Sequence, residues 1–386
     1  MNIELVGKFY DNHSLSLVNR NIAVNLFKKG VKIKITSLDS YNPEYKLRKD
    51  VVAILKQLEQ AELEDIDIQV RHTYPPIWKW PERENTKVVY IQPWEFPKAP
   101  FEWQYKFETF ADALIVPSNY CASVFSTGGI KPDNLFVVPN GYDHSIFNTE
   151  VSNTDVSSYG INEEDFNFVY VGNAQWRKGL DILLNAWHSA FRKYDKAKLI
   201  IKDNSRIYGA SNTLNESLKL QYKTDCAEII YIDKDLSDEE MSAIFKASDV
   251  VVHPYRAEGF AMHIQEAVAC GCLPIVSAKG PTDDFLSDDV GIKLPVIANP
   301  VNIENQHIFA LKPGDATTLM STHTFINEPT QEDLKKAMMH VYHSHYRKDM
   351  YARLEQAQLN NWDSVADKYL EVFKNIANRE STRRNQ

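Results

Sequence analysis

The stretch FNFVYVGNAQWRKGLDILLNAWHSAF, residues 166–191, shows the unit from which most of the chain is built. Its first part, Phe166–Val171, is an apolar run that predicts a buried strand, and the polar loop after it ends at Gly179. From Gly179 to Phe191, apolar residues recur at helical spacing. A strand, a loop and a helix in this order are typical of βαβ units, which form parallel sheets.

The same alternation occurs on both sides of this stretch. Before it, the sequence predicts strands at 3–6, 31–35, 66–70, 88–91, 113–116 and 136–138, and helices at 15–27 and 51–63. After it, strands are predicted at 198–201, 229–232, 250–252 and 273–276, and helices at 237–247, opened by a Ser-x-x-Glu capping box, and at 264–270. A polar stretch, 148–164, separates the two series, while 299–330 shows no clear periodicity. We therefore expect an α/β protein with two parallel-sheet domains, 1–150 and 151–362.

Composition and charge narrow the classes of function. A length of 386 residues fits two domains of ~100–200 residues each. The 43 basic and 52 acidic residues give a net charge of −9, which disfavours a partner bound through bulk charge, such as nucleic acid. No signal peptide or run of about 18 apolar residues is evident, so we expect a cytoplasmic protein. The four cysteines form no CxxC pair, and we expect no metal site.

Two groups of charged residues lie where parallel sheets bind ligands, at the carboxyl ends of strands. Arg177 and Lys178 precede Gly179 at a predicted helix start, where cations and free N–H groups together favour an anion. Glu258 follows the strand at 250–252, and Glu266 lies in the next helix, so both carboxylates can accept hydrogen bonds from ligand hydroxyls. The alternatives are a solvated basic turn and two surface glutamates. Neither a P-loop nor a GxGxxG fingerprint is present.

Arg177-Lys178-Gly179, Glu258-Gly-Phe and Glu266, with the run Ala-Cys-Gly-Cys-Leu-Pro274, resemble the motifs of family 4 glycosyltransferases. The strings Val116-Pro-Ser-Asn119 and Val138-Pro-Asn-Gly-Tyr-Asp143 occupy similar places in the first domain. The resemblance implies the GT-B architecture, with two Rossmann-like parallel-sheet domains facing across a cleft. It also implies that a C-terminal helix, about 363–386, packs back on the first domain.

The resemblance implies roles for individual residues. Lys178 matches the lysine at the donor diphosphate, Glu258 the acid near the transferred sugar, and Glu266 the acid at the donor ribose. We expect catalysis to depend on Lys178, Glu258 and Arg177. The expected donor-binding residues are Gly7, Asn173, Arg177, Lys178, Lys202, Glu258, Gly259, Phe260, Ala261, Met262, His263 and Glu266.

On the acceptor side the chain departs from the family pattern. Gln92 stands where many members carry a histidine, and Asn173 stands where many carry an arginine. The loop Lys8–Ser14 has no glycine, although many relatives are glycine-rich there. The expected contacts to acceptor or sugar are His13, Ser14, Arg71, Gln92, Trp94 and Asn119. Polar turn-capping and aromatic core packing are the alternatives for these positions.

The function that this resemblance implies is retaining, metal-independent transfer of a sugar from a nucleotide-diphosphate donor to an acceptor hydroxyl, with no cofactor beyond the donor. The alternatives are a GT-B nucleotide-sugar epimerase and an inactive relative that only binds a nucleotide or sugar. The acceptor is a saccharide, a lipid-linked sugar or another hydroxyl compound, with nucleic acid less favoured. Membrane association has little support because the first domain shows no strongly basic amphipathic helix.

Overall fold

The computed structural model of the protein describes residues 1–150, 152, 154–162, 164–204, 225–302, 323–344, 354 and 357–379. Contacts between residues divide the chain into two compact units. The first unit comprises Met1–Trp94, Lys98–Gly141 and Asn360–Gln386, and the second comprises Glu95–Pro97 and Tyr142–Leu359. The domain bounds expected from the sequence, 1–150 and 151–362, remain a prediction.

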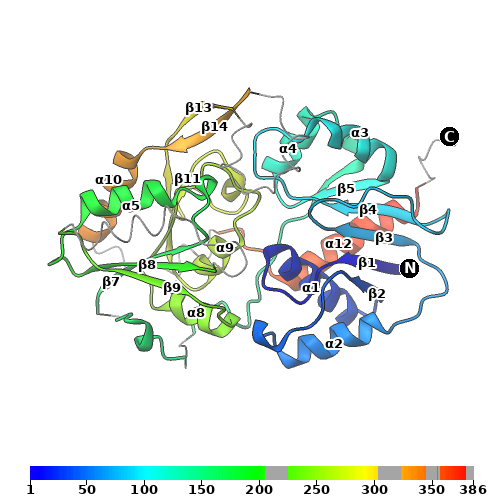
Figure 1. Ribbon diagram of the computed structural model, residues 1–386, viewed down its shortest axis with the longest axis horizontal. Helices are drawn as coiled ribbons and strands as arrows, with labels where there is room; N and C mark the ends of the chain where they lie inside the picture. Colours follow the sequence, from blue (N-terminus) through cyan, green and yellow to red (C-terminus); the bar gives the residue numbers. More distant parts are fainter. Residues whose placement is uncertain are drawn as a thin grey trace. The chain divides into compact units, whose positions relative to one another are not determined.

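The first unit is built on a six-stranded parallel sheet with the order β2-β1-β3-β4-β5-β6 (Figure 1). The chain leaves β1 in both directions across the sheet, because β2 lies on one side of β1 and β3 on the other. The strands are β1 (Asn2–Gly7), β2 (Lys32–Ser37), β3 (Ile68–His72), β4 (Lys87–Ile91), β5 (Ala113–Val116) and β6 (Leu135–Val137). The predicted parallel sheet is therefore confirmed for this half.

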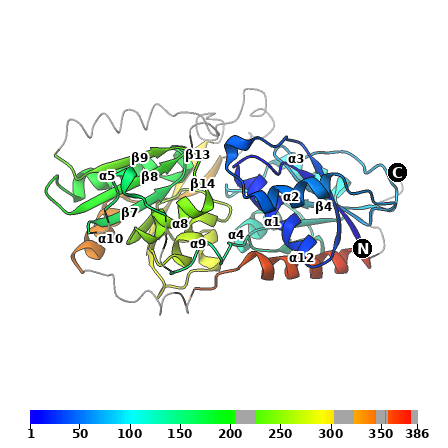
Figure 2. The same cartoon turned by 90° about the horizontal axis from the view of Figure 1, so that it is seen from below.

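The helices of the first unit are α1 (Ser14–Lys28), α2 (Lys49–Glu59), α3 (Phe101–Phe110), α4 (Asn119–Thr127) and α12 (Trp362–Ala377). The last of these is distant in sequence and packs beside α1, where Lys29 pairs with Asp363 at 2.9 Å and Asp367 at 3.0 Å (Figure 2). Its buried residues recur at helical spacing: Trp362, Val365, Ala366, Tyr369, Phe373 and Ile376. The role of α12 is thus to cover part of the first unit with the end of the chain.

The second unit has a six-stranded parallel sheet with the order β12-β11-β10-β7-β8-β9. Its first strand, β7, again has a neighbour on each side, so the chain reverses direction across the sheet between β7 and β10. Ligands bind at such switch points in doubly wound sheets. The strands are β7 (Phe166–Val171), β8 (Ala197–Asp203), β9 (Ile229–Asp233), β10 (Val250–His253), β11 (Leu273–Ser277) and β12 (Ile292–Leu294).

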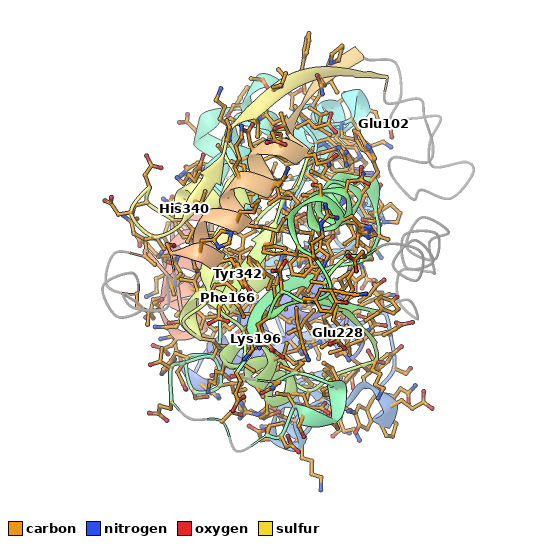
Figure 3. All side chains as sticks on the ribbon, turned by 90° about the vertical axis from the view of Figure 1, so that its left-hand side faces the viewer. Glu102, Phe166, Lys196, Glu228, His340 and Tyr342 are labelled. Atoms are coloured by element: carbon orange, nitrogen blue, oxygen red, sulfur yellow. The ribbon has the colours of Figure 1, made fainter. Side chains whose placement is uncertain are left out.

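Helices cover both faces of this sheet because alternate residues of the strands point to opposite faces. Phe168 belongs to the core under α5 (Leu180–Ala190) and α10 (Gln331–His343), whereas Val169 belongs to the core under α8 (Asp238–Lys246) and α9 (Met262–Ala269). Tyr342 of α10 lies against Phe166 of β7, with ring centroids 5.6 Å apart (Figure 3). The predicted capping box is confirmed at α8, where Ser237 and Glu240 hold each other's backbone N–H groups.

Several elements were not predicted, among them α3, α4, β12 and a hairpin that overlaps the aperiodic stretch. In this hairpin, β13 (Val296–Asn302) and β14 (His323–Pro329) form a two-stranded antiparallel sheet. Its strands carry proline and asparagine, residues that are depleted in strands, so the pattern gave no strand signal. Short 3₁₀ turns complete the described chain at Pro43–Tyr45, Pro132–Asn134, Ser157–Tyr159, Trp176–Lys178 and Pro281–Asp284. Among the described helices, none has the length and apolar character that crossing a bilayer requires.

Candidate active site

The loop after β7 ends in a turn that carries two cations. Trp176–Lys178 form a 3₁₀ turn, and Gly179 joins it directly to α5. Gly179 has φ +72°, and a Cβ added there would lie 1.9 Å from the carbonyl oxygen of Pro254. Only glycine fits this position, because the backbone is left-handed and the loop after β10 lies directly against it. We call Trp176–Gly179 the cation turn.

A buried carboxylate faces the cation turn. Glu258, in the loop between β10 and α9, accepts hydrogen bonds from Arg177 Nη1 at 2.7 Å and from Lys178 Nζ at 3.3 Å. Glu258 is only 8% exposed. Arg177 also pairs through Nη2 with Glu95, at 3.1 Å, in the short segment grouped with this unit. The three residues on which we expect catalysis to depend therefore lie in contact.

The charged groups of this cluster shift each other's pKa values. Burial by itself would raise the pKa of Glu258, but Lys178 and Arg177 outweigh it and hold the pKa at about 2. Burial lowers the pKa of Lys178, and its attraction to Glu258 opposes that change. Glu258 is therefore a carboxylate at neutral pH and can only accept hydrogen bonds.

The backbone between Glu258 and α9 has an unusual conformation and leads into an uncapped helix N-terminus. Ala261, the N-cap residue of α9, has φ +67°, which costs a non-glycine residue conformational energy. The helix has no side-chain cap and no acidic residue in its first turn. Its positive end is thus not neutralised by a local carboxylate. The expected donor contacts of Gly259, Phe260, Ala261, Met262 and His263 remain predictions for this segment.

Several buried polar atoms at the ends of β7 and β10 have no hydrogen-bond partner among the described residues. They are the side-chain oxygens of Asn173 and Gln175, both ring nitrogens of His253, and Nε2 of His263. The two imidazoles meet edge to face with centroids 4.3 Å apart. Burial, and then the charge of Lys178, lower the pKa of His263 to about 3, so this ring is neutral. Buried polar atoms without partners are typical of sites that a ligand or water completes.

Two further expected donor residues lie near this edge of the sheet without joining the cluster. Lys202 ends β8 beside Val171, and its Nζ donates to the carbonyl of Asp203 at 2.6 Å. Glu266 is half-buried on α9, and burial and the charge of Asp238 raise its pKa to about 8. No hydrogen bond from the described residues reaches the Glu266 carboxyl, so its place at a donor ribose stays a prediction.

In the first unit, the loop after β1 is occupied by the protein itself. The backbone N–H groups of Phe9, Tyr10 and Asp11 donate to the carboxylate of Asp39, at 2.8, 3.0 and 2.9 Å. His13 caps α1, with Nδ1 accepting from the N–H of Leu15 at 3.2 Å. The next residue, Ser14, is exposed. The contacts expected for Gly7, His13 and Ser14 stay predictions, and the amides between them already bind an internal anion.

A buried histidine that is not among the expected contacts named above, His72, lies beside Gly7. His72 ends β3, pairs in register with Gly7, and is 3% exposed. Asn19 donates its amide to the carbonyls of Lys8 and His72, so its oxygen accepts from His72 Nδ1, at 2.8 Å. His72 Nε2 is then the unprotonated nitrogen, and it has no hydrogen-bond partner in the described structure. Gly7 lacks a Cβ because Asn19 takes its place.

The roles of the remaining expected acceptor residues of the first unit stay predictions. Arg71 is 1% exposed and donates to Gln69 and to the carbonyls of Ile77 and Lys79, so it holds the loop after β3. This arrangement does not favour an acceptor contact for Arg71. Trp94 is buried and donates to Lys98, and Gln92 is buried and donates to Pro93, whereas Asn119 at the start of α4 is exposed.

The residue of this site that sequence reasoning missed is Arg256. It packs against Trp176 of the cation turn, and its side chain reaches Asp181 of α5 and Glu328 of β14. An arginine in a loop before Glu-Gly looks like a solvated residue in the sequence, and its acidic partners are far away along the chain. Among the described residues, no group of three or more histidine, cysteine, aspartate or glutamate side chains is placed to hold a metal ion.

Comparisons with known proteins relate part of the chain to glycosyltransferases. Residues 151–311 match the family model described as "Glycosyl transferases group 1". An uncharacterized glycosyltransferase of Methanocaldococcus jannaschii is 23% identical over 172 residues, 44% of this chain and 42% of that protein. The D-inositol 3-phosphate glycosyltransferase of Pseudarthrobacter chlorophenolicus is 25% identical over 162 residues, 42% of this chain and 38% of that protein. The matches thus span about two fifths of the length of these curated relatives.

A solved structure extends the likeness to the whole fold. The Anabaena protein HepE, in complex with UDP-glucose, superposes with a TM-score of 0.63 over 97% of this chain and 100% of that chain, at 13% identity. The cation turn, Glu258 and α9 all lie inside the matched range 151–311. Residues 151–311 are therefore similar to the glycosyl transferases group 1 family, and the chain has the GT-B fold.

Proposed function

We propose that the protein is a retaining glycosyltransferase that moves a sugar from a nucleotide-diphosphate donor to an acceptor hydroxyl. The observation that carries this proposal is the contact of Arg177 and Lys178 with Glu258 at the carboxyl ends of β7 and β10. This is the switch point of the second sheet, where such sheets bind ligands. It also lies within the residues that match the group 1 family.

The two cations fit the charge that develops during sugar transfer. Breaking the bond between the anomeric carbon and the diphosphate builds negative charge on the departing oxygens. Arg177 and Lys178 are half-buried and already held by Glu258, so little reorganisation is needed when this charge appears. Glu258 and Glu95 pair with these cations, and the donor diphosphate competes with the two carboxylates. On this proposal the charge is supplied by side chains, without a metal ion.

Glu258 fits the sugar rather than the leaving group. Its pKa of about 2 keeps it ionised, so it can accept hydrogen bonds from sugar hydroxyls and stabilise positive charge near the anomeric carbon. As a carboxylate paired with two cations, it is a poor nucleophile for a double displacement. We therefore favour front-face attack by the acceptor hydroxyl, which retains the anomeric configuration.

Uridine diphosphate sugars are the first donors to test, because the superposed Anabaena protein was solved with UDP-glucose. We expect a UDP-sugar, or another nucleotide sugar, to raise the melting temperature of the wild-type protein, since a ligand that binds only the folded state stabilises it. Lys178→Met removes one charged contact to the diphosphate. We expect it to weaken donor binding about 100-fold, equivalent to about 3 kcal/mol.

The matched control for this experiment is Lys336→Met, because Lys336 lies on α10 with its side chain 68% exposed. It should leave donor binding unchanged. Product formed from a bound donor and an acceptor panel is then examined by proton NMR, and retention of the donor's anomeric configuration is the expected result. Wild-type melting that no nucleotide sugar shifts, or an inverted product, would contradict the proposal.

A further inference from the structure

Arg256 lies behind the cation turn and is buried by contacts from several parts of the second unit. It is 6% exposed, and its guanidinium lies over the ring of Trp176 at 4.3 Å. Nη1 donates to the carbonyl of Trp176 at 2.7 Å, and Nη1 and Nη2 donate to the two carboxylate oxygens of Asp181 at 2.7 and 2.8 Å. Nε donates to Glu328 at 2.5 Å. Four of the five N–H donors of the guanidinium thus have acceptors within the unit.

These partners neutralise the charge of Arg256 within the unit. The guanidinium faces two carboxylates, one on α5 and one on β14, so its charge is neutralised inside the unit. Asn299 of β13 donates to the second oxygen of Glu328 at 2.5 Å, which holds that carboxylate in place. Arg256 is therefore not a free cation for a diphosphate, although it lies two residues before Glu258.

The backbone at Arg256 also forms hydrogen bonds with the cation turn. The N–H groups of Arg256 and Ala257 both donate to the carbonyl of Arg177, at 2.7 and 3.1 Å. Arg256 thereby contacts the cation turn twice, through its side chain at Trp176 and through its main chain at Arg177. The same peptide segment continues directly into Glu258, which pairs with Arg177 and Lys178.

We infer that Arg256 is a positioning residue, which sets the distance between the two cations of the turn and Glu258 and so shapes the anion site. This inference rests on the proposed role of the cation turn in binding a diphosphate. It also assigns a purpose to the β13–β14 hairpin, which supplies Glu328 as one of the two carboxylates that hold the guanidinium. A lysine keeps the charge of Arg256 but cannot reproduce its planar set of donors.

Arg256→Lys tests this inference without changing the net charge. Inorganic pyrophosphate is the probe, and its dissociation constant is measured by calorimetry for the wild type, Arg256→Lys, Lys178→Gln and the double variant. We expect Arg256→Lys to raise the dissociation constant about tenfold in the wild-type background, the loss of about one good charged contact. In the Lys178→Gln background we expect less than a threefold change, because residues that act through one another are not additive.

Arg71→Lys is the matched control. Arg71 is also a buried arginine whose guanidinium is filled by hydrogen bonds, but it lies in the first unit. We expect Arg71→Lys to lower the melting temperature as Arg256→Lys does, and to change pyrophosphate binding less than twofold. This comparison separates positioning from a general loss of stability.

The results also separate this inference from the proposed function. If no nucleotide sugar binds but pyrophosphate binds with the coupling described, the proposed function fails and the positioning role of Arg256 stands. The inference is overturned if the wild type does not bind pyrophosphate, if Arg256→Lys acts equally in both backgrounds, or if Arg71→Lys has the same effect.

Discussion

The two units place a loop at the same point of their sheets and use it in different ways. In the first unit the loop after β1 lies at the switch between β1 and β3, and its amides bind the carboxylate of Asp39. In the second unit the loop after β7 lies at the switch between β7 and β10, and it presents Arg177 and Lys178.

The difference shows that topology supplies a position, whereas side chains decide what the position can bind. Each loop binds a carboxylate of the chain. In the first unit the carboxylate is Asp39, and it accepts from backbone N–H groups, which are then occupied. In the second unit the anion is Glu258, and the groups that hold it are the cationic side chains of Arg177 and Lys178 instead of backbone amides. The predictions below test this contrast, together with the proposed anion site.

The largest effect is expected at Gly179, where the loop after β7 is in close contact with the loop after β10. Gly179→Ala introduces a Cβ at 1.9 Å from the carbonyl oxygen of Pro254 and strains a left-handed residue, so we expect a loss of about 3 kcal/mol or more in unfolding free energy. Gly30 in the first unit has almost the same φ, +77°, with nothing within 4 Å of an added Cβ. Gly30→Ala should cost only about 1 kcal/mol, from backbone strain alone.

Urea unfolding of both variants measures this difference, and pyrophosphate binding reports the site. Equal losses for Gly179→Ala and Gly30→Ala would show that the contact between the loops after β7 and β10 has no energetic weight.

A smaller effect is expected at Asp39, on the other side of the comparison. Asp39→Asn keeps the shape of the side chain but replaces a charged acceptor of three backbone N–H groups by an amide. We expect a loss of about 2 kcal/mol in stability and no change in donor binding. Asp67→Asn is the control in the same unit, because Asp67 is exposed and accepts from one backbone N–H, that of Asn2, at 2.7 Å. A large loss of donor affinity in Asp39→Asn would break the contrast between the two loops.

The smallest effect concerns the two glutamates of the second unit, whose pKa values move in opposite directions. Glu266 has its pKa raised from 4.5 to about 8, so the folded protein holds a proton that the unfolded chain has lost. Its contribution to stability is present below pH 4.5 and is lost as the pH rises toward 8. Glu258 has its pKa lowered to about 2, so its contribution is present above pH 4.5 and is lost as the pH falls toward 2.

Glu266→Gln should therefore match the wild type in stability near pH 5 and exceed it near pH 8.5, with the difference growing as the pH rises. Melting temperature against pH, for both proteins, gives the measurement. Parallel curves from pH 5 to pH 8.5 would show that the Glu266 carboxyl has an ordinary pKa in the folded protein.

Much of the architecture followed from local patterns. Apolar runs such as Phe166–Val171 predicted strands that are buried on both faces, and the Ser237-x-x-Glu240 pattern predicted the start of α8. The β13–β14 hairpin could not be found in this way, because its strands contain proline and asparagine, and their pairing connects residues 21 to 33 positions apart.

The residues of the candidate site likewise include some that the sequence predicted and some that it did not. Arg177, Lys178 and Glu258 were chosen from the sequence because motif residues at the ends of neighbouring parallel strands must come close together. Asp39 and Arg256 could not be chosen, because each acts through partners brought near by the fold: the amides of the loop after β1, and the carboxylates of Asp181 and Glu328.

The sequence by itself therefore determined the two α/β halves, the edge of the second sheet where the site lies, and the charges placed there. These depend on periodicity and on residues a few positions apart, which act locally. Only the tertiary structure decided which charges neutralise each other: Glu258 with Arg177 and Lys178, and Arg256 with Asp181 and Glu328. The energy of a charge depends on its neighbours within a few ångströms and on its exclusion from water, and both are set by packing between segments far apart along the chain.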